Sequence, residues 1–151
     1  MRISLAAIFA SSVLVAAPVS AQDSETKETL QKLPPAVQEA VKAQGQGATL
    51  RGLAKEVKGG VTLYEAEMTV DGRSRDILFD AQGKIVSMEE EKTLSEIPAA
   101  ARAAIQKAVG VGKLALVEKV TNGETTFYEG HINSGGKVSE VKVDANGKPV
   151  D

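Results

Sequence analysis

The feature that most constrains this chain is an internal similarity that holds at one offset, 64 positions, without a gap. The matched segments carry the same turn, proline and aromatic signals: Leu33-Pro34 with Ile97-Pro98, Tyr64-Glu65 with Tyr128-Glu129, and the run from Asp80 to Val86 with the run from Asp144 to Val150. A single offset that spans helix, turn and strand signals is typical of a duplicated structural unit. The sequence therefore predicts two copies of one supersecondary unit.

Each copy has the signals of one helix followed by four strands. Pro34 and Pro98 stand where a helix begins and a missing N–H costs nothing, and apolar residues follow them at helical spacing. Glycine-rich turns then separate alternating stretches at 50–58, 61–70, 73–80 and 85–86, and at 114–121, 125–134, 137–144 and 149–150. We therefore expect an α+β fold of two tandem α-β-β-β-β repeats, with antiparallel sheet or sheets and the helices packed on one face.

The N-terminal segment has the pattern of a secretory signal peptide. A charge-free apolar run follows Arg2, ends at Pro18, and is followed by small residues suited to cleavage after Ala21. A membrane anchor is the alternative, but a spanning helix needs about 20 apolar residues and this run is shorter. We expect a periplasmic or secreted protein with a signal peptide at 1–21, a flexible segment at 22–32, repeats at 33–88 and 96–151, and a linker at 89–95.

Composition excludes several kinds of site. The 151 residues include no Cys and one His, which excludes disulfides, thiolate metal sites, Cys nucleophiles and any site that needs two imidazoles. The net charge is −2, and it becomes −3 when Arg2 leaves with the signal peptide, so nucleic acid and anionic lipid exert no long-range attraction. No serine lies on a recognisable nucleophile turn. We therefore expect no enzymatic activity, no cofactor, no nucleic-acid partner and no stable membrane insertion after cleavage.

Three motifs recur in the two copies. The first copy reads Leu33-Pro34-x-x-Val37-x-x-x-Val41, Tyr64-Glu65-Ala66-Glu67-Met68 and Phe79-Asp80-Ala81-Gln82-Gly83-Lys84-Ile85-Val86; the second reads Ile97-Pro98, Tyr128-Glu129-Gly130-His131-Ile132 and Val143-Asp144-Ala145-Asn146-Gly147-Lys148. These motifs resemble the PepSY-like family, whose members are also described as β-lactamase-inhibitor-like. The resemblance implies an exported, non-enzymatic module of helix and antiparallel sheet. It also implies a binding role, since related modules restrain secreted peptidases and the inhibitor grips its target with an open sheet face.

Hairpin geometry predicts which side chains share a face. A two-residue loop at 71–72 places Val70 opposite Arg73, so Tyr64 pairs with Phe79 on one face, together with the apolar residues between them. We expect this apolar face to lie under the helix, with Tyr64 and Tyr128 as core anchors. The opposite, open face then carries the candidate binding residues Glu65, Glu67, Asp76, Glu129, His131, Glu140 and Lys142.

The two hairpins differ on that open face. Glu129 with Lys142 and His131 with Glu140 are complementary cross-strand pairs, whereas Glu67 and Asp76 form a like-charge pair that costs stability if directly opposed. The simplest interpretation is that the two carboxylates point into water or borrow a lysine from a neighbouring strand. A cation or a basic partner group resting on Glu65, Glu67 and Asp76 is the alternative. Three oxygen ligands are fewer than hard cations usually take, so we assign no metal site.

The sequence therefore predicts a binding module of the cell envelope. Its partner would be another envelope protein, with a hydrolase that it restrains as one candidate, held through the open sheet face. The alternative is an envelope protein that binds a small ligand or a cation with the acidic sheet patch. His131 beside a carboxylate is most simply a surface pair, although an imidazole there would titrate in the range of a pH sensor.

Overall fold

One antiparallel sheet forms the centre of the computed structural model, which describes residues 24–150. The sheet has eight strands in the order β1 to β8, so that each strand pairs with its neighbours in the chain. The strands are β1 Ser24–Lys27, β2 Thr49–Lys58, β3 Val61–Val70, β4 Arg73–Phe79, β5 Ile85–Glu91, β6 Lys113–Asn122, β7 Thr125–Ser134 and β8 Lys137–Val143. A 3-10 helix, η1 Leu30–Lys32, and helix α1 Pro35–Gln44 separate β1 from β2, and helix α2 Ala99–Val109 separates β5 from β6.

The helix boundaries follow from local chemistry. Pro34 and Pro98 precede α1 and α2, and Gly45 and Gly110 end them, as the sequence predicts. Asp80 turns the chain after β4, since its Oδ1 accepts hydrogen bonds from the backbone N–H of the residues two and four positions later, both at 2.9 Å. Within residues 24–150 no helix is long and apolar enough to cross a membrane. The predicted signal peptide at 1–21 lies outside the described residues.

The prediction of two tandem α-β-β-β-β repeats is wrong, although the α+β class holds. The sheet does not divide, because β5 pairs with β6 over a register that runs from Ser87↔Asn122 to Glu91↔Glu118. The fourth strand expected at 149–150 is absent from the described chain, where Val143 and Pro149 form an isolated bridge. Two backbone hydrogen bonds flank this bridge, from Asp144 N–H to Lys148 O at 2.8 Å and from Val150 N–H to Lys142 O at 3.1 Å, so the missing N–H of Pro149 is not required there.

Two segments expected to be irregular belong to the sheet. β5 extends through the acidic run to Glu91, so strand occupies the first part of the segment 89–95 that the sequence analysis assigned to a linker. β1 lies in the segment 22–32, where flexibility was expected, and pairs with the outer edge of β2. Both strands pair with strands that are distant in the sequence. Local sequence patterns do not indicate which distant strand a segment pairs with.

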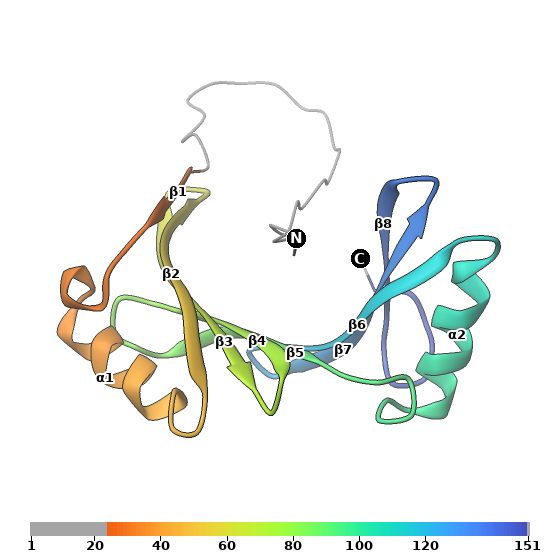
Figure 1. The fold of residues 1–151 in the computed structure, drawn as a ribbon, viewed down its shortest axis with the longest axis horizontal. Coiled ribbons are helices and arrows are strands. Elements are labelled where there is room, and N and C mark those ends of the chain that lie inside the picture. Colours follow the sequence, from red (N-terminus) through yellow and green to blue (C-terminus); the bar gives the residue numbers. More distant parts are fainter. Residues whose placement is uncertain (1–23, 151) are drawn as a thin grey trace.

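Both helices pack against the same face of the sheet, one near each end (Figure 1). Val37 and Val41 of α1 join a core that contains Phe79, whereas Ala101 and Ile105 of α2 join a second core around Val143. The sheet bends between these two cores, and its face without helices is concave (Figure 1). The fold therefore presents one broad, helix-free surface, which we call the open face.

The predicted hairpin registers are confirmed. Tyr64 lies opposite Phe79 and Glu67 lies opposite Asp76 between β3 and β4. Between β7 and β8, Glu129 lies opposite Lys142 and His131 lies opposite Glu140. The turn residue Asp71, at φ +50°, and Gly72, at φ +81°, adopt the two positive φ angles that a tight two-residue hairpin loop requires.

Candidate functional site: the acidic open face

Carboxylates from six adjacent strands gather on the open face. Side chains alternate along each strand, so the observed registers place one set of them on the same side of the sheet. We call this set the acidic face: Glu56 on β2, Glu65 and Glu67 on β3, Asp76 on β4, Glu89 on β5, Glu118 on β6, and Glu129 on β7. The seven residues predicted from the sequence all lie on this surface, with His131 beside Glu129, and Glu140 and Lys142 on β8.

Arg51 reduces the repulsion between Glu67 and Asp76 in the first half of the acidic face, which consists of the members on β2 to β4. Its guanidinium lies 2.8 Å from Asp76 Oδ1 and 3.7 Å from Glu67 Oε2. A bulge between Leu50 and Gly52 shifts the register of β2 and frees Arg51 from regular pairing. The cation beside this pair is thus an arginine from the neighbouring strand β2, whereas the sequence-based interpretation considered water or a lysine.

Glu65 is the most perturbed carboxyl in the first half of the acidic face. Its pKa is raised from an ordinary value of 4.5 to about 8, first by burial and then by the charges of Glu56, Asp76, Glu67 and Glu25, in that order of effect. A carboxyl with such a pKa is largely protonated at neutral pH. The fold therefore holds an acid for which the described residues supply too little positive charge.

The excess of acid continues across the middle of the sheet. Burial raises the pKa of Asp76 to about 6 even though Arg51 opposes the change. Burial, together with the charges of Glu118 and Glu129, raises the pKa of Glu89 to about 7. These shifts have one direction and the same leading cause, which is burial, and the charges of neighbouring carboxylates add to it.

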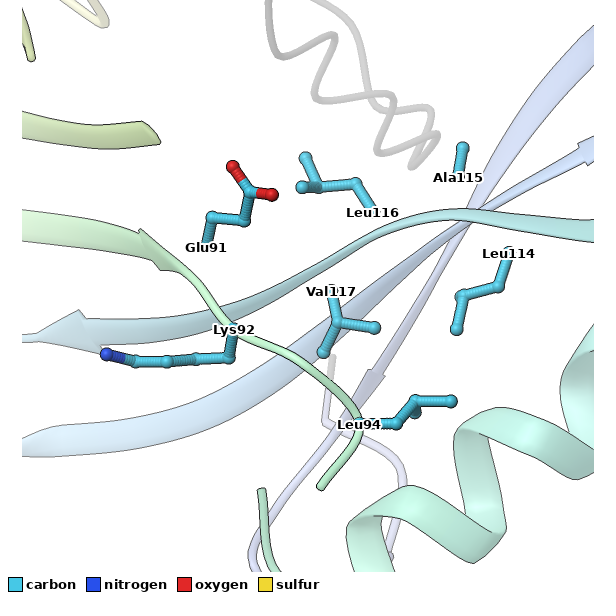
Figure 2. A pocket seen from close by; sticks show the side chains of 7 residues that line it. All are labelled: Glu91, Lys92, Leu94, Leu114, Ala115, Leu116 and Val117. Carbon is cyan, nitrogen blue, oxygen red and sulfur yellow. The ribbon is translucent and has the colours of Figure 1, made fainter. Parts of the chain in front are cut away.

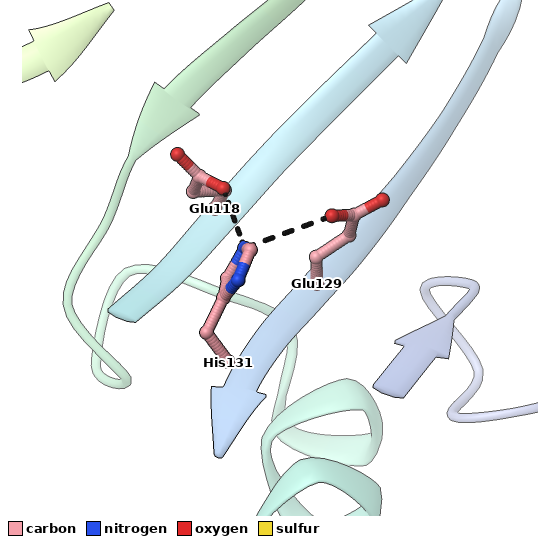
Figure 3. Close-up of side chains that lie close together, drawn as sticks. All are labelled: Glu118, Glu129 and His131. Carbon is pink, nitrogen blue, oxygen red and sulfur yellow. Dashed lines mark hydrogen bonds and ion pairs between the residues drawn. The ribbon is translucent and has the colours of Figure 1, made fainter. Parts of the chain in front are cut away.

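The second half of the acidic face is organised around His131. His131 Nε2 lies 2.8 Å from Glu118 Oε2 and 3.8 Å from Glu129 Oε2 (Figure 3). The hydrogen bond with Glu118 raises the pKa of His131 above its ordinary value, although burial opposes this. Lys142 Nζ lies 3.0 Å from Glu129 Oε1, as the predicted cross-strand pair requires. The sequence-based interpretation of His131 as a surface pair is wrong, since only 6% of this residue is exposed.

Sequence reasoning missed Glu56, Glu89 and Glu118 of the acidic face. Glu89 and Glu118 are placed by the pairing of β5 with β6, which brings the acidic run beside the second half of the sheet. The alternation of side chains along β6 puts Glu118 on one face of that strand. The pairing of β6 with β5, however, is a long-range contact that the sequence pattern does not indicate. The predicted turn at 122–123 would place Glu118 opposite Phe127, whereas the observed loop at 123–124 places it directly opposite Glu129.

Two shallow hollows are candidates for the small-ligand alternative. One, of about 190 Å³, lies where β5 leaves the sheet and is lined by Glu91, Lys92, Leu94 and residues 114–117 of β6 (Figure 2). Pockets that enclose small molecules usually measure about 300 Å³ or more. The other, of about 590 Å³, lies between the residues after α2 and the turn after β7, away from the acidic face. The acidic face itself is therefore better suited to a partner surface or an ion than to an enclosed organic ligand.

The raised pKa of Glu65 predicts that stability falls as pH rises. An acid with a higher pKa in the folded state stabilises the fold fully below its unfolded pKa, about 4.5, and loses that contribution as pH rises through about 8. Each tenfold change in acidity constant corresponds to about 1.4 kcal/mol, and solvent screening lowers the effect of this half-buried group to the order of 2 kcal/mol. We expect the free energy of unfolding to decline between pH 5 and pH 9, measured by urea denaturation.

Matched variants test the assignment to Glu65. Glu65→Gln should flatten the decline, whereas Glu39→Gln, at an exposed position on α1, should leave it unchanged. His131, Asp76 and Glu89 also have raised pKa values and act in the same direction, so a residual slope is expected in Glu65→Gln. A Glu65→Gln protein with the full pH slope of the parent would contradict the prediction.

Comparison with known proteins identifies the fold. No family model and no curated protein matches the chain. Solved structures do match: a protein of proposed periplasmic location from Bacteroides eggerthii has a TM-score of 0.64 at 20% identity, with 79% of this chain and 86% of that chain covered. A BLIP-like protein from Bacteroides fragilis has a TM-score of 0.59 at 22% identity, with 79% and 84% covered.

This chain has the fold of these proteins. A DUF2874 family protein from Bacteroides ovatus has it too, with a TM-score of 0.61 at 14% identity and 80% and 86% of the two chains covered. The BLIP-like fold expected from the sequence motifs is thus confirmed. The finer resemblance to the PepSY-like family stays a prediction, because similarity to solved structures at 14–22% identity shows the fold alone.

Proposed function

We propose that this chain is an exported, non-enzymatic binding module that holds another envelope protein through its acidic open face. The observation that carries the proposal is the shortage of positive charge on that face. Glu65, Asp76 and Glu89 all have raised pKa values because neighbouring carboxylates and burial disfavour their charged forms. A cationic partner surface would favour the charged forms of these carboxyls. The attraction between the two surfaces would then contribute to the binding energy.

Shape and fold support the same function. The open face is concave and free of helices, so it can surround a protruding loop of a partner (Figure 1). A BLIP-like protein shares this fold, and inhibition of a hydrolase is one form that such binding takes. Periplasmic location is supported by the signal-peptide pattern at 1–21 and by the similarity to a protein of proposed periplasmic location.

A non-enzymatic role is supported by how the single imidazole is used. His131 carries the single imidazole of the sequence, a side chain often used as a general base near neutral pH. Its Nε2 is engaged with Glu118, and its Nδ1 faces Glu140 at 3.7 Å. Both ring nitrogens thus face carboxylates where nucleophilic catalysis requires a hydroxyl or a bound substrate.

A capture experiment with charge-reversed baits tests the proposal. The exported chain, immobilised, is exposed to an extract of its own envelope fraction, and bound proteins are identified by mass spectrometry. Glu67→Lys with Glu140→Lys places positive charge on the open face, at side chains that are 35% and 28% exposed. We expect a partner that binds the parent chain to be reduced at least tenfold on this bait, and to be released by raised salt.

The control bait carries Glu39→Lys and Glu124→Lys, at exposed positions on α1 and on the turn after β6. Both double variants change the net charge by the same amount, so a difference between them reports the surface and not the overall charge. Equal capture by the two baits, or absence of any partner that distinguishes them, would refute binding through the open face.

A further inference from the structure

Three potential metal ligands meet on the second half of the acidic face. Glu118 on β6 lies directly opposite Glu129 on β7, and His131 follows Glu129 two positions later on the same face. The residues are 5%, 5% and 6% exposed, respectively. Their potential ligand atoms all lie within 4.8 Å of one another, and the imidazole stands beside both carboxylates (Figure 3). This mixed nitrogen and oxygen set sits on two paired strands, which hold it rigidly.

The spacing of the inward atoms is close to what one ion requires. Zn²⁺ binds imidazole nitrogen and carboxylate oxygen at about 2.0–2.2 Å, which puts two ligands of a tetrahedral ion about 3.4 Å apart. His131 Nε2 lies 2.8 Å from Glu118 Oε2 and 3.8 Å from Glu129 Oε2. Shifts of less than an ångström, within the reach of glutamate rotamers, would bring both pairs to that value.

The outward atoms of the same residues face second groups. Lys142 Nζ forms an ion pair with Glu129 Oε1 at 3.0 Å. The other oxygen of this carboxylate, Glu129 Oε2, lies on the side of the imidazole. On the other side of the ring, His131 Nδ1 lies 3.7 Å from Glu140 Oε1. Metal-binding histidines characteristically direct the second ring N–H to a carboxylate, which fixes the tautomer and raises the basicity of the ligand nitrogen.

The unpartnered nitrogen of His131 is an independent sign of a ligand. Nδ1 is buried and has no hydrogen-bond partner among the described residues, which is costly for a polar atom in a residue more than nine-tenths buried. An ion on Nε2 would place the ring proton on Nδ1 and draw it toward Glu140, which satisfies this atom. The positive charge of the ion would also balance the charges of Glu118 and Glu129, of which Glu129 has Lys142 at 3.0 Å.

We infer that Glu118, Glu129 and His131 bind one divalent transition-metal ion, with Zn²⁺ as the ion best matched to the donors. One imidazole and two carboxylates suit Zn²⁺ better than Ca²⁺ or Mg²⁺, which prefer oxygen ligands alone. Three protein ligands leave the fourth position of a tetrahedral ion for water or for a donor group of a bound partner. The site goes beyond the proposed function, because it needs no partner to form.

Calorimetric titration of the exported chain, purified without a histidine tag, tests the site with Zn²⁺ alone. We expect one saturable site at pH 7, weakened at least 100-fold by His131→Gln. Glu140→Gln should weaken it about tenfold, the effect usual for a group that orients a ligand. Glu65→Gln, on the first half of the same acidic face, should bind as the parent does. Co²⁺ should give absorption bands in the visible region that are lost in His131→Gln.

The outcomes separate a built site from a merely acidic surface. Circular dichroism of His131→Gln and of Glu118→Gln shows whether each variant is folded, and binding is compared only between folded proteins. Absence of saturable Zn²⁺ binding, equal binding by His131→Gln, or equal competition by Ca²⁺ would each overturn the inference. The titration contains no partner protein, so its failure leaves the proposed function standing.

Discussion

Replacing Phe79 by alanine should lower the free energy of unfolding by about 3–5 kcal/mol. Phe79 is fully buried at the end of β4, where it joins Val37 of α1 and Met68 of β3 in the first core. Its removal leaves a cavity between helix and sheet that Ala66, also fully buried and small, cannot fill. Urea unfolding followed by circular dichroism measures the loss.

A conservative variant separates the cavity from other effects of the change. Phe79→Leu keeps most of the apolar volume and should cost about 1.5 kcal/mol or less if the neighbours repack. Val138→Ala, at a side chain on β8 that is 39% exposed, should change stability by less than about 0.5 kcal/mol. If Phe79→Ala cost no more than Val138→Ala, the first core would not depend on Phe79.

Gly83→Ala should destabilise the protein by about 2–5 kcal/mol, from two physical sources. Gly83 has φ +77°, where a side chain costs about 1–2 kcal/mol. An added Cβ would also lie 2.5 Å from the backbone oxygen of Ala36 in α1, so the turn or the helix must move, at a further cost of about 1–3 kcal/mol. Thermal unfolding of the variant measures the sum.

Gly59→Ala is the matched control for backbone strain alone. Gly59 also has a positive φ, +55°, but an added Cβ meets nothing within 4 Å. The difference between the two variants therefore reports the close approach of the turn to α1. A Cβ added at Gly147 would likewise lie 2.6 Å from the backbone oxygen of Ala100 in α2, so Gly147→Ala should behave like Gly83→Ala. Equal losses in Gly59→Ala and Gly83→Ala would show that the turn does not support the helix.

Hairpin registers were accessible to sequence reasoning because a two-residue turn determines every pairing that follows. The loop at 71–72 placed Glu67 opposite Asp76, and the loop at 135–136 placed His131 opposite Glu140; the structure confirms both. The helix ends at Gly45 and Gly110 were predictable for the same reason, because their chemistry is local. Each of these predictions needed residues within one turn or one hairpin.

The errors concern partners that are distant in the chain. A run of three glutamates has low strand propensity, and the sequence analysis assigned 89–95 to a linker for that reason. β5 includes Glu89, Glu90 and Glu91 because Arg75 pairs with Glu90, Ser74 bonds to Glu91, and β6 supplies the second edge. The pairing of β5 with β6 then merges what were expected to be two repeats into one sheet.

By itself, the sequence determined the two helices, the hairpins at 71–72 and 135–136, and the face on which the charged side chains of these hairpins lie. These properties depend on turn chemistry and on the alternation of a strand, both of which are local. Only the tertiary structure decided that one sheet runs from β1 to β8 and that Glu118 meets His131 in a buried cluster. Such contacts depend on the long-range pairing of strands. They also depend on how far the surrounding structure buries the side chains that this pairing brings together.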